Sequence, residues 1–385
     1  MSASETIAVV PRQSGAWRRA VLRGGGRLAA TVALAIIVIF VLLAMSADDP
    51  AAALGSLLSG PFTSSFRTGQ WLSDSANLML SGAAVAMVFR AGQFSLGAEG
   101  QILVGALAAG AAVLHLPSFP GVFVVGLTLG ALAGFLFGLV PGLMKAYGGS
   151  DEIVSTLMLN YVATYGFALL INRYLQPASA GYPVSDFFDP AAFLPSLRIG
   201  QLTIGLALPF AIGCCVAVWY LINWTKTGFE MGAVGASVPF AQATGMRVRR
   251  SVWLSMALSG LIAGLAGAVI AEGSTHRLIV GLSANIGFDG ILVALLTANR
   301  PLLIPLAAVA YGYIRTGGDI AQLSSGIPRE VITTLQGFLI LAVTARAPLA
   351  WIRHRAGRRR PAHGGPVIPG PAPLRAAASS QRTGS

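Results

Sequence analysis

The chain has 385 residues, of which 55% are hydrophobic and only 10% are charged, and its formal net charge is +12. The apolar residues form runs too long for a soluble core, which is typical of a protein that crosses a membrane several times. A nucleic-acid-binding protein would interleave its basic residues with polar ones on a folded surface, whereas here they lie between apolar runs and in the two tails. Nucleic acid is therefore excluded as the expected partner.

Windows of about twenty residues predict about ten membrane-spanning helices, so the expected fold class is an all-α polytopic membrane protein. Residues 1–27 form a basic N-terminal segment, 28–347 a transmembrane domain, and 348–385 a basic tail with too little apolar content to order itself. The eighth and ninth runs are short enough to be re-entrant instead of crossing. The predicted spans are 28–46, 71–89, 99–116, 121–143, 153–174, 202–223, 252–272, 285–299, 302–317 and 330–347.

The basic residues predict the orientation of these spans. Ten crossings place twenty of the 26 Lys and Arg residues on one side and six, Arg315 among them, on the other. Short cytoplasmic loops carry the excess of positive charge. We therefore expect a multi-pass protein of the bacterial inner membrane with both termini cytoplasmic and an external loop at about 175–201.

Glycine recurs at every fourth residue of the fourth predicted span, which places one glycine stripe along one face of a helix. Such a stripe lets a second helix backbone approach closely within a membrane. The pattern predicts helix packing, with no role in transport. The glycines are Gly126, Gly130, Gly134, Gly138 and Gly142.

Two similar Gly-x-acid-Gly segments, Gly97–Gly100 and Gly287–Gly290, each precede an apolar helix, and the two helices are predicted to run in opposite directions. This pattern is typical of inverted repeats with interrupted helices, which approach a central substrate site. The carboxylates of Glu99 and Asp289 either contribute to that site or are bound by amide groups at a helix start. The sequence leaves both interpretations open.

Polar residues recur at every fourth position of the fifth predicted span. Glu152, Thr156, Asn160 and Thr164 lie on one helix face. An amide or carboxylate facing lipid would be poorly satisfied, so this face is expected to turn toward protein or toward a polar path. Contact with a solute's hydroxyl groups and hydrogen bonding between helices are the two alternatives.

The chain lacks the usual parts of an enzyme. It has no HExxH motif, no nucleophile elbow and no Cys/His cluster, and its adjacent Cys214 and Cys215 offer no metal site, so we expect no metal and no cofactor. Neither Lys145 nor Lys226 follows a glycine, which excludes a P-loop. Energy from ATP would have to come from another polypeptide.

Three segments carry a specific resemblance: Phe94–Gln101, Glu152–Tyr161 and Gly287–Ile291. They resemble the permeases of bacterial nucleoside and simple-sugar ABC importers, within the branched-chain amino acid permease superfamily, and the similarity covers about residues 28–347. The resemblance implies a cytoplasmic ABC ATPase, a second permease subunit forming a heterodimer, and an external substrate-binding protein. The substrate path is expected to include Glu99, Gln101, Thr156, Asn160 and Asp289.

The segment from Trp224 to Ser251 is the longest internal cytoplasmic loop and resembles the part of this family that meets the ATPase. We expect a short helix at about 239–244 that docks on the ATPase. The alternative is an interfacial helix anchored to anionic membrane lipid by Arg247, Arg249 and Arg250. The expected coupling residues are Gly228, Gly235, Ala241, Ala243 and Gly245.

Three other functions remain open from the sequence. An ion-coupled secondary transporter would use the same inverted repeats and interrupted helices. An ABC permease for branched-chain amino acids would share the superfamily, with much of the substrate selection made by the external receptor. A membrane enzyme or a subunit with no transport role is disfavoured because no catalytic set converges.

Overall fold

The computed structural model describes residues 49–199, 202–325, 331, 334 and 337. The chain divides into two units, 1–344 and 345–385, and all described residues belong to the first. The long helices are α3 (Ser65–Arg90), α4 (Ala98–His115), α5 (Val122–Gly148), α6 (Glu152–Leu170), α7 (Ala207–Trp224), α10 (Val248–Ile270) and α12 (Ile304–Ser325). The shorter elements are α2 (Pro50–Ser59), η1 (Gly60–Phe62), the π-helical turn η2 (Ile171–Leu175), η3 (Pro190–Ala192), β1 (Ser196–Ile199), β2 (Leu202–Gly205), α8 (Lys226–Ala236), α9 (Val238–Ala243), the π-helical turn η4 (Ala271–Thr275), α11 (Ile286–Leu296) and η5 (Pro301–Leu303).

The expected all-α membrane fold is confirmed, although the count of ten spans is not. Among the described residues six helices are long and apolar enough to cross a membrane: Ser65–Arg90, Ala98–His115, Val122–Gly148, Glu152–Leu175, Ala207–Trp224 and Val248–Thr275. The predicted first and tenth spans, 28–46 and 330–347, lie outside the described residues or almost entirely so.

The eighth and ninth predicted spans form one bent pair. Helix α11 and the segment Pro301–Ser324 meet at 110° and together satisfy the criteria for one broken or re-entrant span. With eleven residues α11 is only about 16 Å long, too short to cross a hydrocarbon core of about 30 Å. Helix α11 therefore does not cross by itself, and the pair forms either one broken span or a re-entrant segment.

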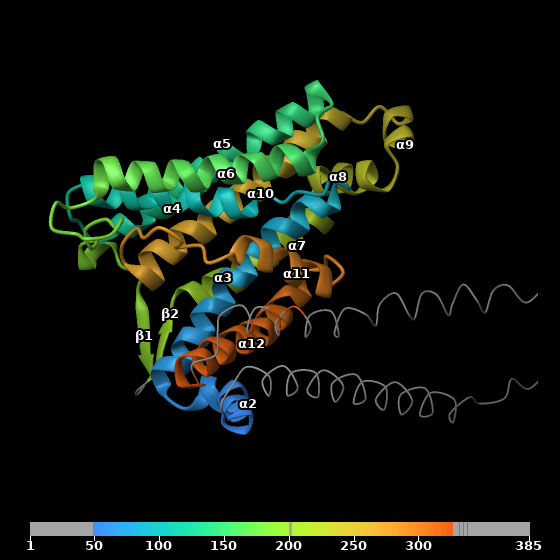
Figure 1. Cartoon of the computed structure of the whole chain (residues 1–385). Coiled ribbons are helices and arrows are strands. Elements are labelled where there is room, and N and C mark those ends of the chain that lie inside the picture. The colour runs from blue at the N-terminus through green and yellow to red at the C-terminus, as the bar shows by residue number, and fades with distance from the viewer. Residues whose placement is uncertain (1–48, 200–201, 326–330, 332–333, 335–336, 338–385) are drawn as a thin grey trace, which may run out of the picture. The chain divides into compact units, whose positions relative to one another are not determined.

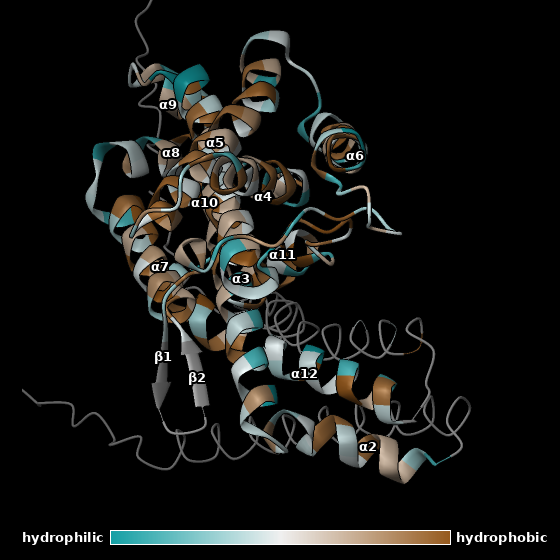
Figure 2. Cartoon of the chain, turned by 90° about the vertical axis from the view of Figure 1, so that its left-hand side faces the viewer, coloured by the Kyte–Doolittle hydropathy of each residue, from teal (hydrophilic) through white to brown (hydrophobic). Residues whose placement is uncertain are grey.

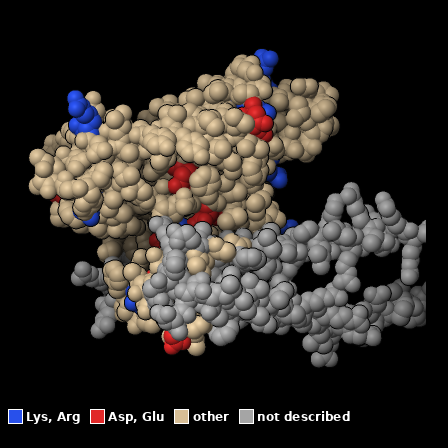
Figure 3. Space-filling model, viewed as in Figure 1, with Lys and Arg blue, Asp and Glu red and all other residues tan. Residues whose placement is uncertain are grey.

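Helices α4, α5, α6 and α10 lie side by side, and α3 packs against α10 on one side and against α7, α11 and α12 on another (Figure 1). Figure 2 shows hydrophobic residues along α5, α6 and α7 and hydrophilic residues at α9. On the face drawn in Figure 3 most of the surface over α4, α5 and α6 carries no charge, as expected for helices that meet lipid or another apolar chain.

The glycine stripe of α5 is the contact surface for α10. All five glycines are buried, and a β-carbon at Gly138 would lie 2.6 Å from the carbonyl oxygen of Met256. One at Gly142 would lie 2.9 Å from the Cα of Trp253. Along Gly134–Gly142 the two backbones are too close for a side chain between them, which confirms that the stripe serves packing.

The helices begin where polar side chains can bind their free amide groups. Asp151 accepts from the N–H groups of Ile153 and Val154 at the start of α6, and Thr225 accepts from Gly228 at the start of α8. The predicted sixth span starts too early, because Leu202–Gly205 pair with Ser196–Ile199 as an antiparallel hairpin and α7 begins only at Ala207. Threonine and β-branched residues at 199–204 favour a strand.

The segment between α6 and the hairpin is tied to neighbouring loops by polar contacts. Asp189 accepts from Ala191 N–H at 2.9 Å and from the Ser118 hydroxyl at 2.9 Å. These donors favour the ionised form, so the pKa of this exposed carboxyl is lowered below its ordinary value. The Ser185 and Phe188 N–H groups bind the carbonyls of Leu278 and His276. The segment therefore packs on the chain that follows α10.

Candidate functional site

The two interrupted helices predicted from the repeat meet through Glu99. Its buried carboxylate accepts the Ser283 hydroxyl at 2.5 Å and the Gly287 N–H at 2.8 Å. Helix α11 begins at Ile286, so the carboxylate lies at the positive end of that helix, where a negative charge is favourable. Glu99 thus lies in the first turn of α4, and its carboxylate binds groups at the start of α11, the helix of the second Gly-x-acid-Gly segment.

Of the four polar residues predicted to share one face of α6, Thr156 and Asn160 turn toward the start of α4. Glu152 instead pairs with Lys145, and Thr164 is exposed. Thr156 is 0% exposed and Asn160 is 5% exposed. The Asn160 amide accepts from Gly100 N–H at 2.9 Å and donates to the Leu96 carbonyl at 2.7 Å. The Thr156 hydroxyl accepts from Leu96 N–H at 3.1 Å. Both side chains hold the extended segment through which the chain enters α4.

Gln101 completes this cluster. It is buried on the first turn of α4, and its Oε1 has no hydrogen-bond partner among the described residues. Four of the five predicted path residues, Glu99, Gln101, Thr156 and Asn160, therefore gather around the start of α4. We call these four residues the α4 entry cluster.

Asp289, the fifth, lies on α11 and is bound by α12. Its carboxylate forms an ion pair with Arg315 and accepts the Tyr311 hydroxyl at 2.7 Å, and Arg315 also donates to the Ala284 carbonyl at 2.8 Å. Arg315 lies within α12, in the predicted ninth span, and its side chain is largely buried. A basic residue within an apolar helix is itself the signal that it has a buried partner.

Sequence analysis missed a further carboxylate at the end of an apolar helix, Glu272. It is 0% exposed in the π-helical turn η4, and neither of its oxygens has a hydrogen-bond partner among the described residues. Gly126 at the end of the α5 stripe leaves the space that the carboxylate occupies. The charged residue near the end of an apolar span was the signal that could have marked it.

The segment after α7 forms two helices, α8 and α9, where one had been predicted at about 239–244. Helix α9 matches that prediction. Gly228 and Gly235 allow close backbone contact: a β-carbon would lie 2.6 Å from Ile222 Cα at the first and 2.7 Å from Gly92 N at the second. Gly245 has a φ of 77°, which favours glycine. Gly228 and Gly235 therefore let the segment pack closely against α7 and against the end of α3.

The two predicted coupling alanines of α9 face opposite ways. Ala241 is 0% exposed and packs against Val234 and Val252, whereas Ala243 is exposed. Phe240, at 58% exposed, shares the outer surface of α9 with Ala243. A partner would therefore meet Phe240 and Ala243, and a charge at Ala241 would first disturb the internal packing of the segment.

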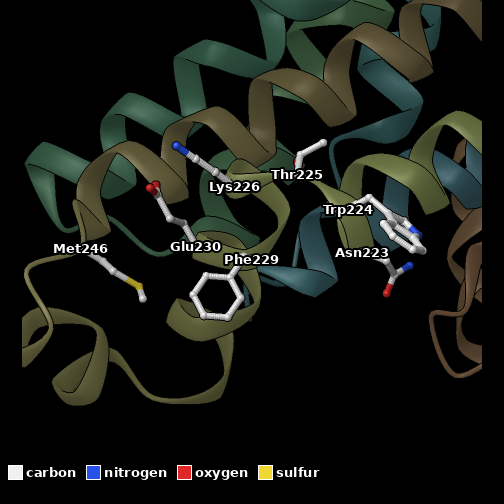
Figure 4. Close-up of a pocket in the computed structure, with 7 residues that line it drawn as sticks. All are labelled: Asn223, Trp224, Thr225, Lys226, Phe229, Glu230 and Met246. Carbon is white, nitrogen blue, oxygen red and sulfur yellow. The ribbon is translucent and has the colours of Figure 1, made fainter.

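A groove of about 480 Å³ lies beside α8 at the end of α7. In Figure 4 the side chains of Lys226 and Glu230 extend to one side of α8, while the Phe229 ring extends to the other. Trp224 and Phe229 are both strongly exposed. The groove is lined by Asn223, Trp224, Thr225, Lys226, Phe229, Glu230 and Met246.

Comparison with known proteins covers most of the chain. Residues 67–344 match the family described as branched-chain amino acid transport system / permease component. A guanosine ABC transporter permease protein of Bacillus subtilis is 32% identical over 81% of this chain and 90% of its own length. A glucose ABC transporter permease protein of Haloferax volcanii is 31% identical, covering 76% of this chain and 80% of its own length.

A nucleoside ABC transporter permease protein of Lactococcus lactis is 27% identical over 72% of this chain and 79% of its own length. No solved structure matches the chain. The family match and the relative at 32% identity agree with the interrupted helices and with the resemblance found in the sequence. The chain belongs to the branched-chain amino acid transport system permease family and is a multi-pass inner-membrane permease of an ABC importer.

Proposed function

We propose that this permease forms the translocation path for a nucleoside or a simple sugar. The observation that carries the proposal is the meeting of two interrupted helices, α4 and α11, at the buried carboxylate of Glu99. Interrupted helices in transporters lie at the substrate site, where their polar ends can meet a solute. The names of the relatives, which specify guanosine, nucleosides and glucose, support this substrate class.

The α4 entry cluster is our candidate for the polar wall of this path, together with Asp289. Its members already bind backbone groups of residues 96–100 and 283–287. A solute with several hydroxyl groups would exchange bonds with these carboxylate, amide and hydroxyl groups as the helix ends move apart. The same side chains would therefore hold the path closed and line it with polar groups once it opens.

The permease has no ATPase site of its own in this proposal. ATP is hydrolysed by a cytoplasmic ABC ATPase, a second and unlike permease chain completes a heterodimer, and an external binding protein delivers the solute. Both chain termini are cytoplasmic, which the surplus of basic residues on that side supports.

Uptake by the purified chain tests the need for partners. In proteoliposomes we expect uptake of radiolabelled guanosine or glucose only when the second permease, the ATPase and the binding protein are present with ATP inside. The matched control is the same assembly with an ATPase variant that cannot hydrolyse ATP. Uptake by this chain alone, driven by a proton or sodium gradient, would identify a secondary transporter instead.

Helix α9 is the proposed contact with the ATPase. Exchanging Phe240 for glutamate is expected to abolish co-purification of the ATPase and solute-stimulated ATP hydrolysis, because a charge replaces the largest exposed apolar side chain of α9. Phe66→Glu, at 80% exposed at the start of α3, far from the segment that meets α8 and α9, is the matched control and is expected to keep both. Normal coupling in Phe240→Glu would exclude α9 as the contact.

A further inference from the structure

A second groove, of about 420 Å³, lies between the end of α5, helix α9 and the start of α10. We call it the arginine groove. It shares Met246 with the groove beside α8. That groove is lined by both a lysine and a glutamate, whereas the charged residues of this one are all arginines. Its lining residues are Tyr147, Gln242, Met246, Arg247, Val248, Arg249 and Arg250.

The three arginines of the groove are exposed and lack acidic partners among the described residues. Among the residues that the structure describes, the ion pairs are Lys145–Glu152 and Arg315–Asp289. Neither pair includes an arginine of the groove. The Arg249 guanidinium lies 5.5 Å from the centre of the Tyr147 ring, within the range of a cation–π contact. Three unneutralised guanidinium groups at one groove favour a ligand that carries an anionic oxygen group, such as a phosphate.

The groove lies at the ends of two helices that are long and apolar enough to span a membrane. Helix α5 ends at Gly148 and α10 begins at Val248, and both belong to the six apolar helices that can span a membrane. Chain positions at such helix ends meet the headgroup region, where tyrosine and arginine are favoured. Met246 and Val248 are half-buried and give the groove an apolar floor. A phosphate with an attached glycerol and acyl chains would contact both the cations and this floor.

We propose that the arginine groove binds the headgroup of an anionic phospholipid in the adjoining leaflet. A dissolved phosphate would use the guanidinium groups but not the apolar floor. An acidic segment of the ATPase is a different occupant, and the position of the groove at the ends of α5 and α10 favours lipid over it. The proposal rests on the placement of this end of the helices at the membrane surface, and not on the identity of the transported solute.

The test uses the purified full chain in neutral detergent, titrated with short-chain phosphatidylglycerol or phosphatidylcholine and followed by native mass spectrometry. We expect the wild-type chain to bind phosphatidylglycerol about tenfold more tightly than phosphatidylcholine, since three guanidinium groups line the groove and only the first lipid carries a net negative charge. The variant Arg247→Gln/Arg249→Gln/Arg250→Gln is expected to lose that preference. The corresponding Lys variant, which keeps the charge, is expected to retain most of it.

The matched control is Arg67→Gln/Arg173→Gln/Arg277→Gln, which removes the same charge from α3, from η2 and from the segment after η4 and is expected to bind like the wild-type chain. Three results would overturn the proposal: a preference that survives the triple Gln change, equal loss in the control, or full competition by inorganic phosphate. A triple Gln variant that binds phosphatidylglycerol normally but no longer co-purifies with the ATPase would assign the groove to the ATPase. Size-exclusion chromatography confirms that each variant is folded.

Discussion

Exchanging Arg315 for methionine is expected to destabilise the permease by about 3–5 kcal/mol, because it leaves the Asp289 carboxylate buried without its cation. The change also frees the Ala284 carbonyl. Ala284 and Asn285 have φ angles of 44° and 66°, a left-handed conformation that costs energy in residues other than glycine. The measurement is the melting temperature in detergent together with the amount of protein in the membrane.

The double variant Arg315→Met/Asp289→Asn is the control for this pair. Removing both charges is expected to recover much of the lost stability. One charge left without its partner inside the protein lowers the free energy of unfolding more than the replacement of both charges does. A double variant as unstable as the single one would show that the two residues are not energetically coupled. A stable double variant without uptake would place Asp289 in the solute path, whereas normal uptake would make the pair structural.

Exchanging Asn160 for leucine is expected to reduce uptake about tenfold or more, because it leaves the Gly100 N–H and the Leu96 carbonyl without their partner. Each unpaired buried backbone group costs about 1–3 kcal/mol. The start of α4 is expected to lose its fixed position, while the apolar substitution keeps α6 in the membrane. Uptake in cells is measured against the amount of permease in the membrane fraction.

Thr164→Val is the matched control on the same helix, since that hydroxyl donates only to the Asn160 carbonyl one turn earlier. We expect it to transport normally. The melting temperature separates two roles for Asn160: lost uptake at unchanged stability would support direct contact with the solute, and a parallel loss of both would support positioning of α4. Normal uptake by Asn160→Leu would exclude the α6 face from the path.

Local chemistry made several features of this permease predictable. The Thr156 and Asn160 face was predictable from its four-residue spacing, because an unsatisfied amide is too costly in lipid to point outward. The glycine stripe of α5 indicated a close helix contact for a similar reason, since only small residues let two backbones approach. Helix α9 was predictable in place and length, because Ser237 and Pro239 favour a helix start and Gly245 a helix end.

The partners of the buried charges depended on tertiary structure. Glu99 binds Gly287 and Asp289 binds Arg315 across distances in sequence that no local pattern encodes. The same limit applies to Arg315: hydropathy places it in an apolar run, whereas the carboxylate that stabilises its charge there is identified only in the folded chain.

The sequence by itself determined the membrane class, the family and the helices whose apolar runs exceed the thickness of the bilayer, because these follow from composition, length and local motifs. Only the tertiary structure decided that α11 and α12 form a bent pair, that Ala241 faces inward while Ala243 faces outward, and that three arginines surround one groove. These features arise from packing between segments distant in the chain, which hydropathy and spacing do not report.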